Sequence, residues 1–132
     1  MQVEGKTLQH LLDLVRTCKD PAGRRRCEAF MRLPSKRDQG DYYSLVTYPI
    51  DLPTIQQRLR SDAYPDATAF VADVNLWLTN TLVGFAEDAS ICEDVEYILE
   101  VSIRDTHTHA HTNTHMHTRR FCLLILIHLR FK

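Results

Sequence analysis

The 132-residue sequence lacks the features that mark secreted, membrane-spanning and strongly charged proteins. Its N-terminus has neither the uninterrupted apolar core nor the small-residue cleavage site of a secretion signal. The longest apolar run, residues 121–127, is far shorter than the roughly 20 residues that a membrane-spanning helix needs. The formal net charge of −1 gives no overall field that favours nucleic acid. These absences favour one small domain with a tail, from a cytosolic or nuclear protein.

Cysteine pairs and catalytic motifs are missing as well. The cysteines, Cys18, Cys27, Cys92 and Cys122, are scattered and contain no C-x-x-C pair. Without a secretion signal they are typical of reduced, mostly buried thiols. The acidic residues form no pair within a motif, and His10 has no nucleophile near it in the sequence. We therefore expect no enzymatic activity and no cofactor.

Two short basic clusters, residues 24–26 and 36–37, interrupt this otherwise balanced charge. Both are typical of a solvated surface rather than of phosphate contacts. Any binding of DNA or RNA through them would be minor, sensitive to salt and independent of base sequence.

Hydrophobic spacing predicts four helices. Apolar residues recur at helical spacing in residues 6–18, 52–60, 67–83 and 91–103. Thr7 and Asp51 fit the N-caps of the first two helices, and Gly84 fits the end of the third. Residues 24–32 are expected to form a short amphipathic continuation of the first helix. Because no segment of useful length alternates at period two, the pattern indicates an all-α bundle.

A long connection, residues 33–50, lies between the first and second predicted helices. It holds two prolines, a glycine and the aromatic residues Tyr42, Tyr43 and Tyr48. A loop of this length inside a compact domain is uncommon and is usually functional. Its aromatic residues predict that it packs against the rest of the domain.

After Arg104 the sequence changes to an alternation of threonine and histidine, THTHAHTNTHMHT at residues 106–118. In an extended chain its five histidines would share one face and could bind zinc, copper or nickel. Only Asp105 is near enough in sequence to orient the rings. A CA dinucleotide repeat read in frame also encodes Thr-His-Thr-His, and we favour this interpretation over an evolved metal site. We therefore expect a folded module at residues 1–103, a truncated last helix, and a non-native or disordered tail at 104–132.

The long loop and its flanking segments carry the most specific motifs. GDYYSLVTYPIDLPTIQQRL, residues 40–59, resembles the bromodomain pattern of Asp-Tyr-Tyr, a few residues, Pro-Ile/Met-Asp-Leu, and then Ile and Leu at helical spacing. GRRRCEAFMRLPSKRDQ, residues 23–39, is similar to the start of that family's long loop. FVADVNLWLTN, residues 70–80, resembles its third helix. The resemblance covers residues 7–101 and looks closest to the modules of polybromo, a multi-bromodomain subunit of chromatin remodellers. It implies a left-handed four-helix bundle.

This resemblance also implies a function. Bromodomains recognise acetyl-lysine on histones, which would make this a nuclear protein with acetylated histone peptides and other remodelling-complex subunits as partners, and no membrane. Family members bind the acetyl oxygen with an asparagine amide at the end of the third helix and with a tyrosine acting through a water. A neutral amide enters a dry apolar pocket only if its oxygen receives a hydrogen bond.

Family motifs place seven residues of this sequence in the pocket. They are Phe30 as an apolar wall, Leu33 and Pro34 as the loop shelf, Tyr42 as the water-binding tyrosine, Asn80 as the first, structural asparagine, Phe85 at the anchor and Ile91 as the gatekeeper. For the wall, shelf, tyrosine and gatekeeper residues, plain core packing is the alternative interpretation.

The anchor departs from the family pattern of Asn-Ala-x-x-Tyr-Asn. Here residues 80–85 read NTLVGF, so Gly84 replaces the tyrosine and Phe85 replaces the anchoring asparagine. Phenylalanine has no donor, and an unsatisfied acetyl oxygen would cost roughly 1–3 kcal/mol. Asp88 is near in sequence, but a carboxylate only accepts. We therefore expect weakened acetyl-lysine binding; the alternative is a structural or protein-interaction module whose pocket is unused.

Overall fold

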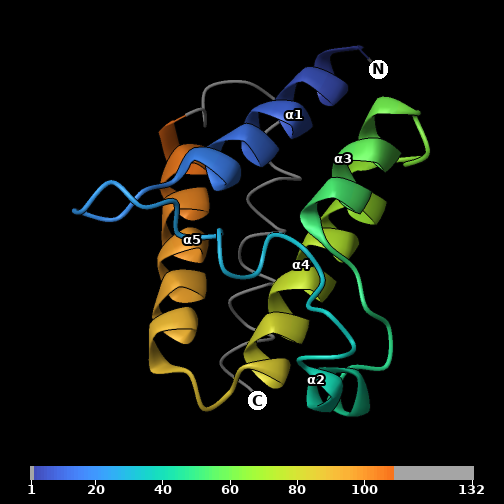
Figure 1. Cartoon of the computed structure of the whole chain (residues 1–132). Helices are drawn as coiled ribbons and strands as arrows, with labels where there is room; N and C mark the ends of the chain where they lie inside the picture. Colours follow the sequence, from blue (N-terminus) through green and yellow to red (C-terminus); the bar gives the residue numbers. More distant parts are fainter. Residues whose placement is uncertain (1, 109–132) are drawn as a thin grey trace.

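The computed structural model of the chain describes the backbone of residues 2–108 and the side chains of residues 7–100. The helices are α1 (Gln2–Thr17), α2 (Gly40–Leu45), α3 (Leu52–Arg60), α4 (Ala67–Gly84) and α5 (Ala89–Thr108) (Figure 1). Residues 2–108 contain no strand, and the all-α prediction is confirmed. The short helix α2 lies inside the long loop, where the sequence did not predict a helix.

Helix α4 organises the bundle, because it contacts each of the other four helices. In Figure 1 it lies between α3 and α5 and runs antiparallel to α5. Its most buried large side chains, Phe70, Trp77 and Leu78, are at most 2% exposed. They pack with Leu12 of α1 and Val95 of α5 in one core cluster. Full burial of each such side chain contributes roughly 1.5–3 kcal/mol, which holds the helices together.

The ends of α3 and α4 follow the capping signals in the sequence. The carboxylate of Asp51 accepts a hydrogen bond from the backbone N–H of Thr54, which makes it the predicted N-cap of α3. Asp66 caps α4 in the same way through Ala69. Helix α4 ends at Gly84, as predicted. A carboxylate at these positions satisfies an N–H group that has no partner within the helix.

Two predictions near the N-terminus are wrong. Thr7 does not cap the first helix, because the backbone is already helical from Gln2. Residues 24–32 form turns rather than a helix. The chain reverses at Gly23, whose φ of 87° suits glycine, and the N–H of Arg26 then donates to the carbonyl of Cys18 at 2.8 Å. Backbone groups paired across this reversal are no longer free for helical hydrogen bonds.

The basic cluster at residues 24–26 is only partly a solvated surface, contrary to the sequence interpretation. Arg24 and Arg26 bind the two carboxylate oxygens of Asp94 on α5, at 2.9 and 3.1 Å. The side chain of Asp94 is 4% exposed and that of Arg26 is 12% exposed. The guanidinium of Arg26 also lies over the ring of Tyr97, 3.8 Å from its centroid. These contacts fasten the first reversal of the chain to α5.

Helix α5 continues to Thr108, so the domain boundary expected at residue 103 falls within this helix. The boundary itself stays a prediction. Residues 109–132 lie outside the described residues, and so do the side chains of the threonine–histidine tract. Among the side chains that are described, no three His, Cys, Asp or Glu residues gather as a metal site. No helix in the described part of the chain is long and apolar enough to cross a membrane.

Candidate functional site

The two ends of the long loop are joined by a hydrogen bond to Asp51, which comes directly before α3. One carboxylate oxygen of Asp51 accepts hydrogen bonds from the backbone N–H and the hydroxyl of Thr54. The other oxygen accepts from the N–H of Leu33 at 3.2 Å. Beside it, the N–H of Leu52 donates to the carbonyl of Met31 at 3.0 Å. The predicted shelf therefore begins at a fixed point, held by the N-cap of the following helix.

Asp51→Ala is expected to lower the free energy of unfolding by about 1–2 kcal/mol, because it removes an N-cap together with the hydrogen bond to Leu33. Urea denaturation followed by circular dichroism measures this loss. Asp51→Asn is the matched control: its amide oxygen still accepts from Thr54, but its NH2 group cannot accept from Leu33, so it should lose less stability than the alanine variant. Equal losses in the two variants would contradict the capping role.

Aromatic residues connect this shelf to α2. The hydroxyl of Tyr43 donates to the carbonyl of Pro34 at 2.6 Å. The ring of Tyr43 meets the ring of Tyr42 edge to face, with 5.3 Å between centroids. Edge-to-face pairs of this kind contribute about 0.5–1.5 kcal/mol beyond the area that they bury. Lys36 lies on the loop with its Nζ 5.4 Å from the Tyr43 centroid.

Tyr42 is the most buried residue of α2, with 3% of its surface exposed. Burial raises the pKa of its hydroxyl, and the nearby Tyr43 and Asp51 raise that pKa further. The hydroxyl therefore keeps its proton at neutral pH and remains a hydrogen-bond donor. On its other side the ring lies directly against Gly84, where an added Cβ would come within 2.2 Å of the Tyr42 Cδ2 atom. The missing side chain at position 84 is what lets the ring take this place.

Phe85 follows α4 as its C-cap residue and packs against Tyr42, with 5.5 Å between the ring centroids. The turn after Phe85 is short: the N–H of Asp88 donates to the Phe85 carbonyl at 2.9 Å. The carboxylate of Asp88 in turn accepts from the N–H of Ile91 at 3.1 Å, at the start of α5. Ile91 is 8% exposed and belongs to the core cluster. The carboxylate of Asp88 thus acts as a helix cap.

Contacts connect five of the seven predicted site residues with the long loop and with the turn between α4 and α5. Leu33 and Pro34 lie in the long loop, Tyr42 and Phe85 form a ring pair, and Ile91 lies in the first turn of α5. Phe30 is 4% exposed and lies deeper. Its ring packs on Trp77, and its carbonyl accepts from the Trp77 indole N–H at 2.9 Å. The packing role of Phe30 is thus the best defined of the set.

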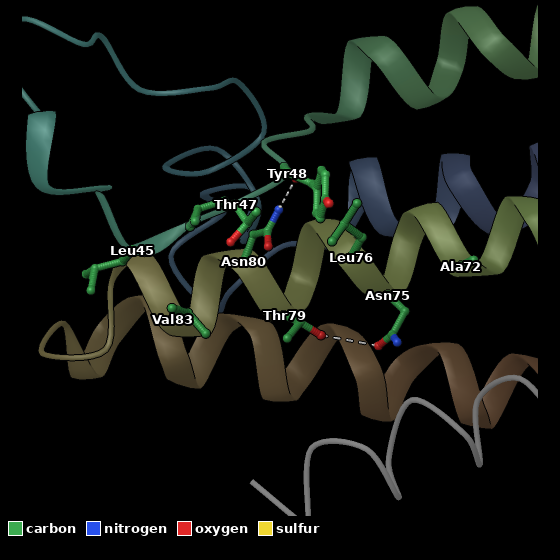
Figure 2. A pocket seen from close by; sticks show the side chains of 10 residues that line it. Leu45, Thr47, Tyr48, Ala72, Asn75, Leu76, Thr79, Asn80 and Val83 are labelled. Atoms are coloured by element: carbon green, nitrogen blue, oxygen red, sulfur yellow. Dashed lines mark hydrogen bonds between the residues drawn. The ribbon is translucent and has the colours of Figure 1, made fainter. Parts of the chain in front are cut away.

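Asn80 is not brought together with these residues. Its amide nitrogen donates to the carbonyl of Tyr48 at 2.8 Å, and its side chain is buried between the loop and α4 (Figure 2). It lines a separate hollow of about 410 Å³ whose walls include neither Tyr42 nor Phe85. A free Asn80 amide would leave the Tyr48 carbonyl without this donor, so the geometry favours a role in holding the loop.

Sequence reasoning missed the contributions of three site residues. Tyr43 supports both Pro34 and Tyr42, and Gly84 gives the Tyr42 ring its space. Asp51 was predicted as a cap but not as the acceptor for Leu33. The Asp-Tyr-Tyr motif was the available signal for Tyr43. Gly84 gave no such signal, because its contact with Tyr42 spans 42 residues of sequence.

Comparison with known proteins adds family evidence to this geometry. The family model described as Bromodomain matches residues 12–97. The subunit rsc4 of the chromatin structure-remodeling complex from Schizosaccharomyces pombe is 31% identical over 97 residues, which cover 74% of this chain and 18% of that protein. Subunit RSC1 from Saccharomyces cerevisiae is 29% identical over 63% of this chain, and rsc1 from S. pombe is 30% identical over 64%. The chain spans less than a fifth of the length of each of these relatives.

Proposed function

Because this chain belongs to the bromodomain family, we propose that it is a chromatin-associated nuclear module that binds acetyl-lysine on histone tails only weakly. Its similarity to subunits of chromatin structure-remodeling complexes supports the chromatin setting, with other subunits of such a complex as partners. The weak binding is supported by one observation: the ring of Phe85, which the family pattern assigns to the anchor position, packs against Tyr42.

The chemistry of acetyl-lysine explains why this observation matters. Acetylation removes the lysine charge and leaves a neutral amide whose oxygen needs a donor when it is buried. The Tyr42 hydroxyl is protonated and can supply one hydrogen bond through a water. Phe85 supplies none, Asp88 already accepts from Ile91, and the Asn80 amide is bonded to the Tyr48 carbonyl. A ligand would find apolar walls but no direct donor.

The missing donor has a definite cost. A buried oxygen left without its hydrogen bond costs roughly 1–3 kcal/mol, which corresponds to about 5- to 150-fold in affinity. The apolar walls would still exclude the charged side chain of unmodified lysine, so the weak binding that remains depends on the acetyl group.

An amide NMR titration of the whole chain tests this proposal. The probes are a histone-tail peptide carrying one acetyl-lysine and the same peptide without the acetyl group. We expect dispersed peaks and, at high concentration, small shifts near Tyr42, Phe85 and Ile91. The shift at Ile91 should appear only with the acetylated peptide. Tight binding would show that Phe85 does not weaken the site. A dispersed spectrum without shifts would instead favour a protein-interaction module with an unused pocket.

A further inference from the structure

A second hollow, of about 920 Å³, opens between α2 and the turn that joins α4 to α5. Asp41 of α2 and Glu87 and Asp88 of the turn contribute three carboxylates to its wall, and the residues lining it include no lysine, arginine or histidine. All three acidic residues are exposed. The hollow therefore presents negative charge from two segments that are far apart in the sequence.

Gly84 and Phe85, at the end of α4, line this hollow. Gly84 lines it without a side chain, and the space next to its Cα is taken by the Tyr42 ring. Phe85 is thus a wall shared with the proposed acetyl-lysine site, whereas Asp41 and Glu87 were not among its predicted residues.

Next to this acidic hollow, which is defined by Asp41, Glu87 and Asp88, lies an apolar ridge formed by Leu45 of α2 and Val83 of α4. Leu45 and Val83 line both this hollow and the neighbouring one of about 410 Å³. The neighbouring hollow has amide and hydroxyl groups but no charged residue, and Figure 2 shows Tyr48 and Leu45 along its loop side. The exposed large hydrophobic side chains found in the described part are Leu45, 58% exposed, and Tyr48, 72% exposed. Both belong to this one surface.

We propose that this α2–α4 surface docks an unacetylated basic peptide segment. A lysine or arginine side chain would lie among Asp41, Glu87 and Asp88, and an apolar side chain of the same segment would cover Leu45 and Val83. Charge complementarity selects this occupant, because three carboxylates without a cation in the hollow repel an acidic segment. The exposed apolar ridge selects a segment with apolar side chains beside its basic ones.

This docking surface does not depend on acetyl-lysine recognition. The acidic hollow would bind the positive charge of an unmodified lysine, and acetylation removes that charge. A basic peptide without any acetyl group therefore tests this surface alone, whereas a shift at Ile91 that appears only on acetylation reports the other site.

The experiment is an amide NMR titration of the whole chain with a short peptide in which lysine, leucine and glycine alternate. The matched probe has glutamate in place of each lysine. We expect shifts at residues 41–45 and 83–88, but none at Ile91, with the basic peptide. These shifts should weaken as salt is raised and should be missing with the acidic peptide. Equal shifts with both peptides, or shifts centred elsewhere on the bundle, would overturn the proposal.

Charge variants provide the second readout. The double variant Asp41→Asn/Glu87→Gln is expected to bind the basic peptide roughly three- to tenfold more weakly, since it removes two exposed ion-pair partners. Asp88 is left intact because it caps α5. The control, Glu93→Gln/Glu96→Gln, makes the same change in net charge at exposed positions of α5 and should bind as the unmodified chain does. Equal weakening in the two double variants would mean that only the net charge of the chain matters, and it would refute a defined docking surface.

Discussion

Phe85→Asn is expected to increase the affinity for a histone-tail peptide carrying acetyl-lysine by about 5- to 150-fold. The substitution places an amide donor at the position that follows α4, next to the Tyr42 ring. The acetyl oxygen would then receive the direct hydrogen bond whose absence costs roughly 1–3 kcal/mol. Asparagine is also smaller than phenylalanine, so the acyl group gains space beside Tyr42. Isothermal titration calorimetry with acetylated and unmodified peptides measures both the gain and its dependence on the acetyl group.

Phe85→Leu is the matched control, because it reduces the ring to a smaller apolar side chain without adding a donor. If the donor carries the effect, the leucine variant should remain close to the unmodified chain in affinity. A comparable gain with leucine would mean that the Phe85 ring blocks the site by its volume alone. No gain with asparagine, in a variant whose NMR spectrum stays dispersed, would show that the pocket is unused and would favour the interaction-module interpretation.

Local signals in the sequence predicted the helices, because each such signal acts within a few residues. Asp51 followed by proline marked the start of α3, and Gly84 marked the end of α4. Residues 24–32 were mispredicted as a helix. The backbone groups of Arg24 and Arg26 pair instead with Asp20 and Cys18, across a reversal of the chain. Helical spacing alone carries no information about a competing turn of this kind.

The sequence motifs identified the candidate site residues but not the contacts between them. Tyr42 and Phe85 were each assigned from a separate motif, but their ring contact joins residues 43 positions apart and follows only from the packing of α2 against α4. The contact also depends on Gly84, whose effect could not be inferred without the position of the Tyr42 ring. Motifs thus identify the candidate residues, and tertiary packing decides which atoms they present.

The ion pairs at Asp94 are another long-range feature, and they lead to the largest expected loss of stability. Asp94→Ala is expected to lower the free energy of unfolding by roughly 3 kcal/mol or more, because it leaves the guanidinium of Arg26 largely buried and without its carboxylate partner. The Nε atom of Arg26 is already buried without a hydrogen-bond partner. Hydrogen bonding to Asp94 also raises the pKa of Arg24, consistent with a favourable pairing. Urea denaturation at neutral pH measures the loss.

Two comparisons separate the buried pair from ordinary surface charge. Asp13→Ala removes a carboxylate from an exposed pair with Arg16, 3.9 Å apart, and should cost at most about 1 kcal/mol. In the double variant Arg26→Met/Asp94→Ala the unpaired charge is gone, so the loss should be smaller than the sum of the two single losses. Additive losses, or a loss for Asp94→Ala no larger than that for Asp13→Ala, would contradict the role given to this pair. A domain of this size holds only about 5–15 kcal/mol in total, so Asp94 contributes a large share of the stability that keeps the Arg24–Arg26 turn on α5.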